Sequence, residues 1–119
     1  MIDNNILADK SFAFALRCVS LYKFLCSEQQ EYVLSKQLLR SGTSIGANIK
    51  ESIYAQSRAD LLSKLCIAKK EAGETEYWIE LLAASHYITE QQAQSLLMDV
   101  KELLRMLIST TKKLSERPI

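Results

Sequence analysis

Apolar side chains recur at helical spacing over most of this chain. Between residues 90 and 114 they follow alternating steps of three and four, and residues 58–86 show the same alternation. That period matches one face of an α-helix, in which about 3.6 residues make a turn. Two earlier helices, at residues 5–27 and 34–56, are separated by a polar run at residues 27–31. The sequence therefore predicts four helices.

Two of the predicted helix starts carry capping residues. Thr89 followed by Gln92 forms a capping box, and Ser57 followed by Asp60 has a related form in which each side chain can accept from a backbone N–H. Helices of similar length joined by short connections favour antiparallel neighbours. We therefore expect an all-α fold, a single antiparallel up-down-up-down four-helix bundle domain over residues 1–119.

The second predicted helix carries Gly42 and Gly46 among other small residues. A glycine inside a helix costs about 1 kcal/mol relative to alanine, so two of them need a packing reason. We expect this helix to approach a neighbour closely. The small residues Ala68, Ala72 and Gly73 of the third helix are the candidate contact.

The first predicted helix is apolar over an arc of roughly 220° when it is drawn at about 100° per residue. A helix that faces a single core needs little more than about 100°. The excess predicts a second contact surface, and we expect copies of the chain to associate as a homo-oligomer. The candidate interface residues are Phe14, Cys18, Leu21 and Leu25.

Charge and composition restrict the functional classes. The chain has 15 Lys and Arg against 14 Asp and Glu, so no global field draws it to nucleic acid or to anionic lipid. Its three cysteines match no metal-ligand spacing, and it opens without a secretion signal. No apolar run approaches the roughly 20 residues that cross a bilayer. We expect a cytoplasmic protein without membrane contact.

Side chains able to do chemistry are few. The single histidine, His86, has Ala83 rather than a glutamate three residues before it, which excludes a ferritin-like metal site. The acidic run at residues 71–80 is typical of an ion-pair face. Asn48 and Glu51 either fix the choice of packing partner from a buried position or form an exposed pair. We predict no enzymatic activity, no catalytic residue, no cofactor and no metal.

Two segments resemble a known family. RSGTSIGANIKES at residues 40–52, preceded by Gln37 and Leu38, resembles the Q-L-x-R-[SA]-x-x-S-I-x-A-N-I-x-E signature of the four-helix bundle family known from 23S rRNA intervening sequences. KEAGETEYWIELL at residues 70–82 is similar to the third helix of that family. The resemblance implies structural roles for Gln37, Arg40, Ser44, Ile45, Ala47, Asn48, Ile49, Glu51 and Glu74.

The resemblance also implies an assembly and a function. Relatives of the family include the accessory variability determinant of diversity-generating retroelements, a pentameric barrel that binds a reverse transcriptase and nucleic acid. We therefore expect a ring-shaped homopentamer that acts as an adaptor for RNA, for DNA, or for a reverse transcriptase or other protein. The alternative is a structural, protein-interaction bundle encoded by an intervening or mobile element, without nucleic-acid binding. Candidate phosphate contacts are Lys36, Arg40, Lys50, Arg58, Lys112 and Lys113.

Overall fold

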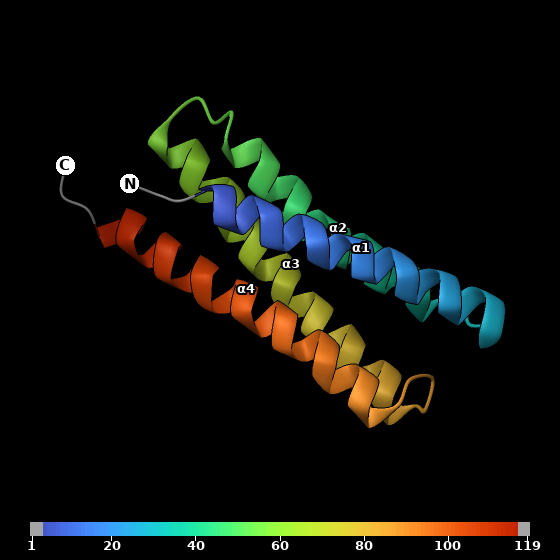
Figure 1. Ribbon diagram of the computed structural model, residues 1–119. Coiled ribbons are helices and arrows are strands. Elements are labelled where there is room, and N and C mark those ends of the chain that lie inside the picture. The colour runs from blue at the N-terminus through green and yellow to red at the C-terminus, as the bar shows by residue number, and fades with distance from the viewer. Residues whose placement is uncertain (1–3, 117–119) are drawn as a thin grey trace.

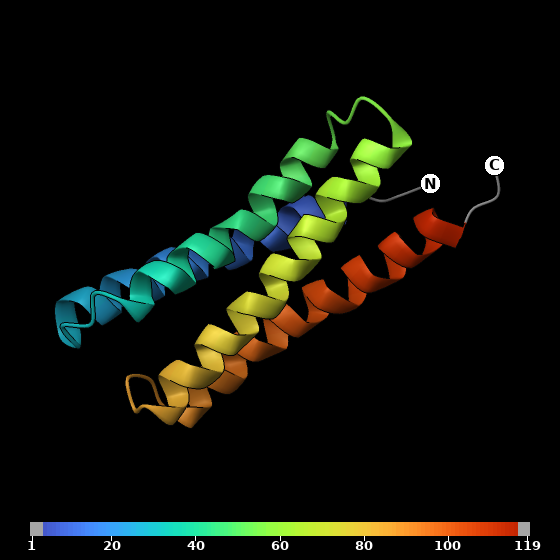
Figure 2. The same cartoon turned by 180° about the vertical axis from the view of Figure 1, so that it is seen from behind.

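The structure is a computed structural model, and it describes residues 4–116. It contains the helices α1 (Asn4–Glu28), α2 (Leu34–Ser52), α3 (Arg58–Ala84) and α4 (Glu90–Glu116). They run up and down in chain order as an elongated bundle of 52 × 21 × 20 Å (Figures 1 and 2). Consecutive helices pack closely, whereas α1 and α4 touch along much less of their length. The predicted all-α, up-down four-helix bundle is confirmed.

The core follows the apolar seams that the sequence predicts on α3 and α4. Leu61 and Leu104 are half-buried at the edges of these seams, and the rest of each seam is closed to solvent. Apolar residues at this spacing stay on one face of the helix, and that face packs against the neighbouring helices. The spacing of the apolar residues alone therefore predicts which residues of α3 and α4 are buried. The buried residues are Leu65, Ala68, Ala72, Thr75, Ile79 and Leu82 on α3, and Ala93, Leu96, Leu97, Val100, Leu103, Leu107, Thr111 and Leu114 on α4.

Both predicted caps are present. The Gln92 backbone N–H donates to Thr89 Oγ1 at 3.0 Å, and the Thr89 N–H donates to Gln92 Oε1 at 2.8 Å. At the start of α3 the Asp60 N–H donates to Ser57 Oγ at 3.0 Å. These bonds satisfy backbone donors that have no partner inside the helix, which fixes where α3 and α4 begin.

A glutamate that the sequence placed only in a polar junction caps α2. Glu31 is 7% exposed and accepts from the backbone N–H groups of Val33, Leu34 and Ser35 at 3.2, 2.9 and 2.7 Å. Burial alone would raise the pKa of the Glu31 carboxyl, but the three donors outweigh it and hold that pKa below its usual value. The charged carboxylate therefore stabilises the first turn of α2.

Two helices end earlier than the sequence predicts. Instead of continuing to residue 56, α2 ends at Ser52, because the N–H groups of residues 53–55 donate to carbonyls three residues back. The third helix ends at Ala84, before the predicted residue 86. There His86 has a left-handed φ of 68°, and the N–H groups of His86 and Tyr87 return to carbonyls of the last turn.

The two glycines of α2 pack against α1. A Cβ on Gly42 would lie 2.4 Å from Cys18 Sγ, and a Cβ on Gly46 would lie 3.4 Å from the Ser11 carbonyl oxygen. A Cβ on Gly73 of α3 would meet nothing within 4 Å. Burial raises the pKa of the enclosed Cys18 thiol to about 12. As expected, α2 approaches a neighbouring helix closely at its two glycines. That neighbour is α1, and not the small residues of α3.

Candidate functional site

One face of α1 is apolar and uncovered. The buried side of this helix runs from Leu7 to Leu25 and faces the core. Phe12 and Leu16 lie outside that stripe, with 67% and 55% of their surface exposed, and Val19 is half-buried one turn further on. Residues four and three positions apart share a helix face. Phe12, Leu16 and Val19 therefore form a line on the outside of the bundle, which we call the α1 ridge.

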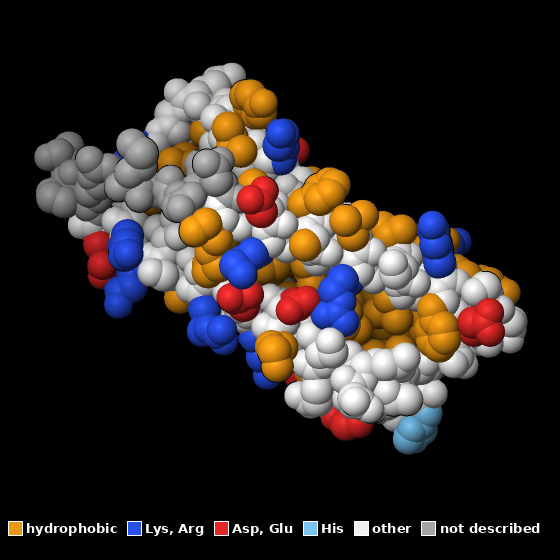
Figure 3. All heavy atoms as spheres, viewed as in Figure 1, with side chains coloured by type: hydrophobic (Ala, Val, Ile, Leu, Met, Phe, Trp, Pro, Cys, Tyr) orange, Lys and Arg blue, Asp and Glu red, His pale blue; other side chains and the backbone are white. Residues whose placement is uncertain are grey.

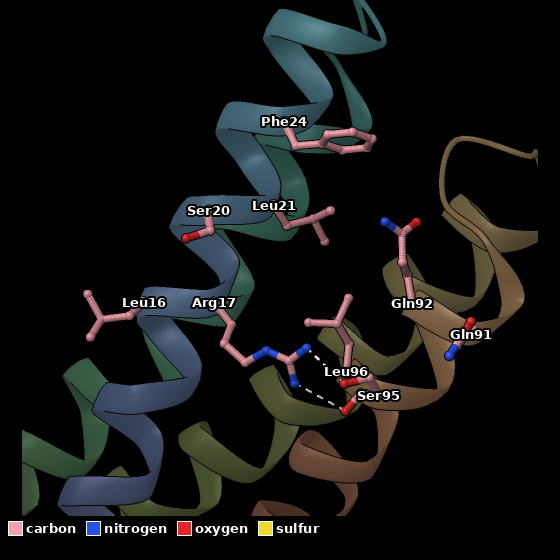
Figure 4. Close-up of a pocket in the computed structure, with 9 residues that line it drawn as sticks. All are labelled: Leu16, Arg17, Ser20, Leu21, Phe24, Gln91, Gln92, Ser95 and Leu96. Atoms are coloured by element: carbon pink, nitrogen blue, oxygen red, sulfur yellow. Dashed lines mark hydrogen bonds between the residues drawn. The ribbon is translucent and has the colours of Figure 1, made fainter.

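Figure 1 shows that α1 and α4 diverge toward the end at which α4 begins. Beside the ridge, a groove of about 730 Å³ lies between these two helices. Hydrophobic side chains gather in this hollow between the two helices (Figure 3). In Figure 4, Leu21 and Phe24 of α1 point across the gap toward Leu96 and Gln92 of α4. We call this the α1/α4 groove, and its lining residues are Leu16, Arg17, Ser20, Leu21, Phe24, Gln91, Gln92, Ser95 and Leu96.

Polar contacts hold α1 to α4 where the helices do meet. Arg17 donates to Asp99 Oδ2 at 2.7 Å. Figure 4 shows its bonds to Ser95, to Oγ at 2.9 Å and to the backbone carbonyl at 3.2 Å. Lys10 Nζ lies 3.3 Å from Glu102 Oε1. Each of these ion pairs is about 40% exposed, where such pairs contribute at most about 1 kcal/mol. The contact between α1 and α4 is therefore weak, and the α1/α4 groove stays open to solvent.

The candidate interface residues do not lie together on the surface. Phe14, Cys18 and Leu25 are at most 2% exposed and belong to the core of the chain itself. Only Leu21 reaches the α1/α4 groove. A second copy could contact the other three only by opening the bundle, so the exposed apolar surface of α1 is the ridge instead. The helical wheel gave the width of the apolar arc but not which part of it faces the core.

Arg40, a candidate phosphate contact, is engaged inside the chain. Its guanidinium donates to Glu71 Oε1 at 3.3 Å and to Glu74 Oε2. The Trp78 indole N–H also donates to Glu74, at 2.9 Å, and together with Arg40 it lowers the pKa of that carboxyl. The hydrogen bond to Glu74 raises the pKa of Arg40 further. This cluster joins α2 to α3 and pairs the Arg40 guanidinium with two carboxylates.

The other basic candidates divide between the two ends of the bundle. Arg58 donates to the backbone carbonyl of Leu114 at 2.5 Å, which places the start of α3 against the end of α4. The four lysines are exposed, and no carboxylate among residues 4–116 pairs with them. Lys36 lies near the start of α2 and Lys50 near its end, whereas Lys112 and Lys113 lie in the last turns of α4. Figure 2 shows that the ends of α2 and α4 lie at the same end of the bundle.

The motif residues of α2 divide between core and surface. Asn48 Nδ2 donates to the Ser44 carbonyl at 2.8 Å, within its own helix, and Glu51 pairs with Lys64 of α3 at 3.0 Å. Asn48 therefore does not set the register of α2 against a neighbouring helix of this chain. The others are the buried Ile45 and Ile49 and the exposed Gln37 and Ala47.

The acidic run on α3 is an ion-pair face. Glu71 and Glu74 hold Arg40, and Glu76 lies 3.8 Å from Lys101 of α4. Among residues 4–116, no three side chains of His, Cys, Asp or Glu are grouped so that they could hold a metal ion. Within the same range, no helix is long and apolar enough to cross a membrane.

Fold and groove together define an up-down four-helix bundle with one apolar side left open. The family described as 23S rRNA-intervening sequence protein matches residues 3–109, and the chain belongs to this family. The resemblance of the α2 and α3 motifs to that family is thereby confirmed.

A solved structure has the same fold. It is the 1.70 Å crystal structure of a protein with unknown function from the S23 ribosomal protein family of Bacteroides thetaiotaomicron VPI-5482. The two sequences are 59% identical, the TM-score is 0.90, and the similarity covers 92% of this chain and 97% of that chain. No curated protein matches this chain.

Proposed function

We propose that this protein is a non-enzymatic, homo-oligomeric adaptor. In this proposal the α1 ridge of one copy packs into the α1/α4 groove of the next, and the assembly presents its outer surface to a partner. The observation that carries the proposal is that an exposed apolar ridge lies directly beside an open apolar groove on the same side of the bundle.

The energetics favour covering this side. Burying a large apolar side chain is worth about 1.5–3 kcal/mol relative to leaving it exposed. In a single chain, Phe12, Leu16 and the exposed apolar side chains of the groove wall remain in contact with water, so this free energy of burial is not gained. Single exposed apolar residues are common, but a contiguous patch is typical of an interaction site.

Ridge and groove also suit a closed ring. When each ridge enters the groove of the next copy and each groove receives the ridge of the previous copy, the contact is head-to-tail and repeats from copy to copy. Such a contact either closes into a ring or continues as a filament. The resemblance to a family whose relatives include a pentameric barrel supports the ring, and five copies is the number that we propose.

The resemblance also supplies the class of partner. The accessory variability determinant binds a reverse transcriptase and nucleic acid, and we propose a partner from the same two classes for this protein. The adaptor needs no chemistry of its own, since its task is to hold the partner on a multivalent surface.

A matched pair of variants tests the assembly. Leu16 of the ridge and Ile108 of α4 are 55% and 51% exposed, and Ile108 lies outside the groove lining. Leu16→Lys places a charge in the proposed contact and should give a folded monomer, because an unpaired buried charge is strongly unfavourable. Ile108→Lys should keep the mass of the unmodified protein. Equal masses for all three proteins, measured by light scattering after gel filtration, would contradict the proposal.

A second candidate is a protein-interaction bundle that binds no nucleic acid. The ion pairs of Arg40 with Glu71 and Glu74 favour this second candidate, because the arginine of the family motif is then paired with carboxylates of its own chain and not with a phosphate. An intact oligomer with no affinity for RNA or DNA at low salt would support this candidate over the first.

A further inference from the structure

The net charge of +1 conceals a separation of charge along the bundle. The end at which α1 begins and α4 ends also contains the α2–α3 connection (Figures 1 and 2). Residues 4–14, 45–70 and 104–116, which we call the termini half, carry nine Lys and Arg against four Asp and Glu. Residues 15–44 and 71–103, the hairpin half, carry five against nine. One half is therefore distinctly basic and the other acidic.

Ion pairing sharpens this contrast. In the hairpin half, Arg17, Arg40 and Lys101 are each held by a carboxylate. In the termini half, only Lys10 and Lys64 have such a partner among the described residues. The lysines and arginines of the termini half that remain outside ion pairs are Lys50, Arg58, Lys69, Lys70, Arg105, Lys112 and Lys113.

An exposed aromatic ring lies at the same end of the bundle. Tyr54, in the α2–α3 connection, is 72% exposed. It follows Lys50 by one helical turn and precedes Arg58 by four residues. Because Arg58 bonds the carbonyl of Leu114, the end of α4 with its two lysines, at residues 112 and 113, borders the same connection.

We propose that the termini half binds single-stranded nucleic acid, with Lys50, Lys112 and Lys113 at phosphates and an unpaired base stacked on Tyr54. The inference rests on the proposed function, in which it specifies the partner class and the surface that meets it. Basic side chains supply sequence-independent affinity for the backbone, and stacking on an aromatic ring accepts any base. A duplex offers the same phosphates but keeps its bases stacked inside, so the tyrosine favours a single strand.

Assembly would multiply this surface. In a ring with cyclic symmetry whose bundles stand parallel to the symmetry axis, all copies point the same way, so their basic halves form one face and their acidic halves form the other. Several weak contacts on one strand then act together through their high effective concentration.

The test compares the two ends of the same molecule. Lys36, a candidate phosphate contact from the sequence, lies in the acidic hairpin half and is not a contact in this proposal. Lys36 and Lys50 are both exposed lysines of α2, one near each end of the helix, and neither has an ion pair among residues 4–116. Tyr54 and Tyr32 are both exposed tyrosines of inter-helix connections, at 72% and 53%. The variants Lys50→Gln with Tyr54→Leu and Lys36→Gln with Tyr32→Leu therefore change charge and aromatic content identically.

The probe is a fluorescent oligouridylate of about 20 nucleotides, which is longer than the roughly 4–16 nucleotides that one small domain covers. Its binding is measured by fluorescence anisotropy at increasing salt concentrations. The unmodified protein should bind it, with affinity that weakens as salt rises. The Lys50 and Tyr54 variant should lose at least about tenfold in affinity, and the Lys36 and Tyr32 variant should stay within about twofold.

Three results would overturn the inference. They are no binding of the oligonucleotide at low salt, equal losses in the two variants, and duplex RNA bound as tightly as the single strand. The mass of each sample separates this test from the previous one. An oligomer that does not bind overturns the nucleic-acid surface alone, whereas a monomer that binds overturns the assembly alone.

Discussion

Replacing Gly42 with alanine tests the closest contact between α1 and α2. The added Cβ would lie 2.4 Å from Cys18 Sγ and 3.1 Å from Cys18 Cβ. Cys18 is fully buried, so its sulfur cannot move into solvent. One side chain or one helix must shift instead. Such overpacking typically costs about 1–3 kcal/mol.

Gly73→Ala is the matched control. Both glycines lie inside helices with negative φ, and each gains about 1 kcal/mol of helix propensity on becoming alanine. At Gly73 the new Cβ meets nothing within 4 Å, so this variant should be more stable by about that amount. Because the propensity cancels, the two free energies of unfolding should differ by about 1–3 kcal/mol. For a domain of this size that is roughly 3–6 °C in Tm per kcal/mol.

A double-mutant cycle assigns the cost to the sulfur. Cys18→Ala removes Sγ, so Gly42→Ala should be better tolerated in that background than in the unmodified protein, with a coupling of about 0.5–3 kcal/mol. Urea unfolding at one fixed protein concentration gives all four free energies, since assembly makes stability depend on concentration. If Gly42→Ala stabilises the protein as much as Gly73→Ala does, the close approach of α1 and α2 is refuted.

Three further predictions concern polar contacts. Glu31→Gln should lower the free energy of unfolding by about 1–2 kcal/mol at neutral pH, since a charged cap is lost. The depressed folded-state pKa of Glu31 means that its contribution is complete above the unfolded value of about 4.3 and disappears as pH falls through the folded one. Urea unfolding should therefore show the variant and its parent converging in acid, and a constant gap would contradict the cap. Thr75→Val should cost about 1–2 kcal/mol in the same assay, because the buried Ser41 hydroxyl loses its 2.8 Å donor; an unchanged midpoint would contradict this. Arg40→Ala should cost less than about 1 kcal/mol, and less again in high salt, because the arginine is half-exposed; a larger, salt-independent loss would show that its carbon chain packs.

Much of the fold could be predicted from spacing alone. The seams of α3 and α4 keep one period over about 25 residues, and that length leaves little choice of face. The capping box at Thr89 and the cap at Ser57 could also be predicted, because each is a local pattern of two residues. The cap from Glu31 was missed. A glutamate two residues before the N-cap position has no such fixed pattern, and only the folded turn directs its carboxylate to three N–H groups.

The surface was harder to predict than the core. The spacing of apolar residues indicates that the apolar face of α1 is wider than one core contact needs. It does not distinguish Phe14, which is buried, from Phe12, which is exposed, because the burial of each ring depends on where α2 and α4 pack. The charge separation was hidden for a similar reason. Antiparallel helices fold distant segments of the sequence onto the same end, so counts taken along the chain mix the two halves.

Self-association through α1 is the central property of the proposed function. Its most direct test is the mass of the unmodified protein in solution, followed by sedimentation over a dilution series down to micromolar concentration. We expect a particle that stays a multiple of the 13.5 kDa chain, with five copies as the proposed number. A stable species of 13.5 kDa at micromolar concentration, with α1 still helical, would contradict it.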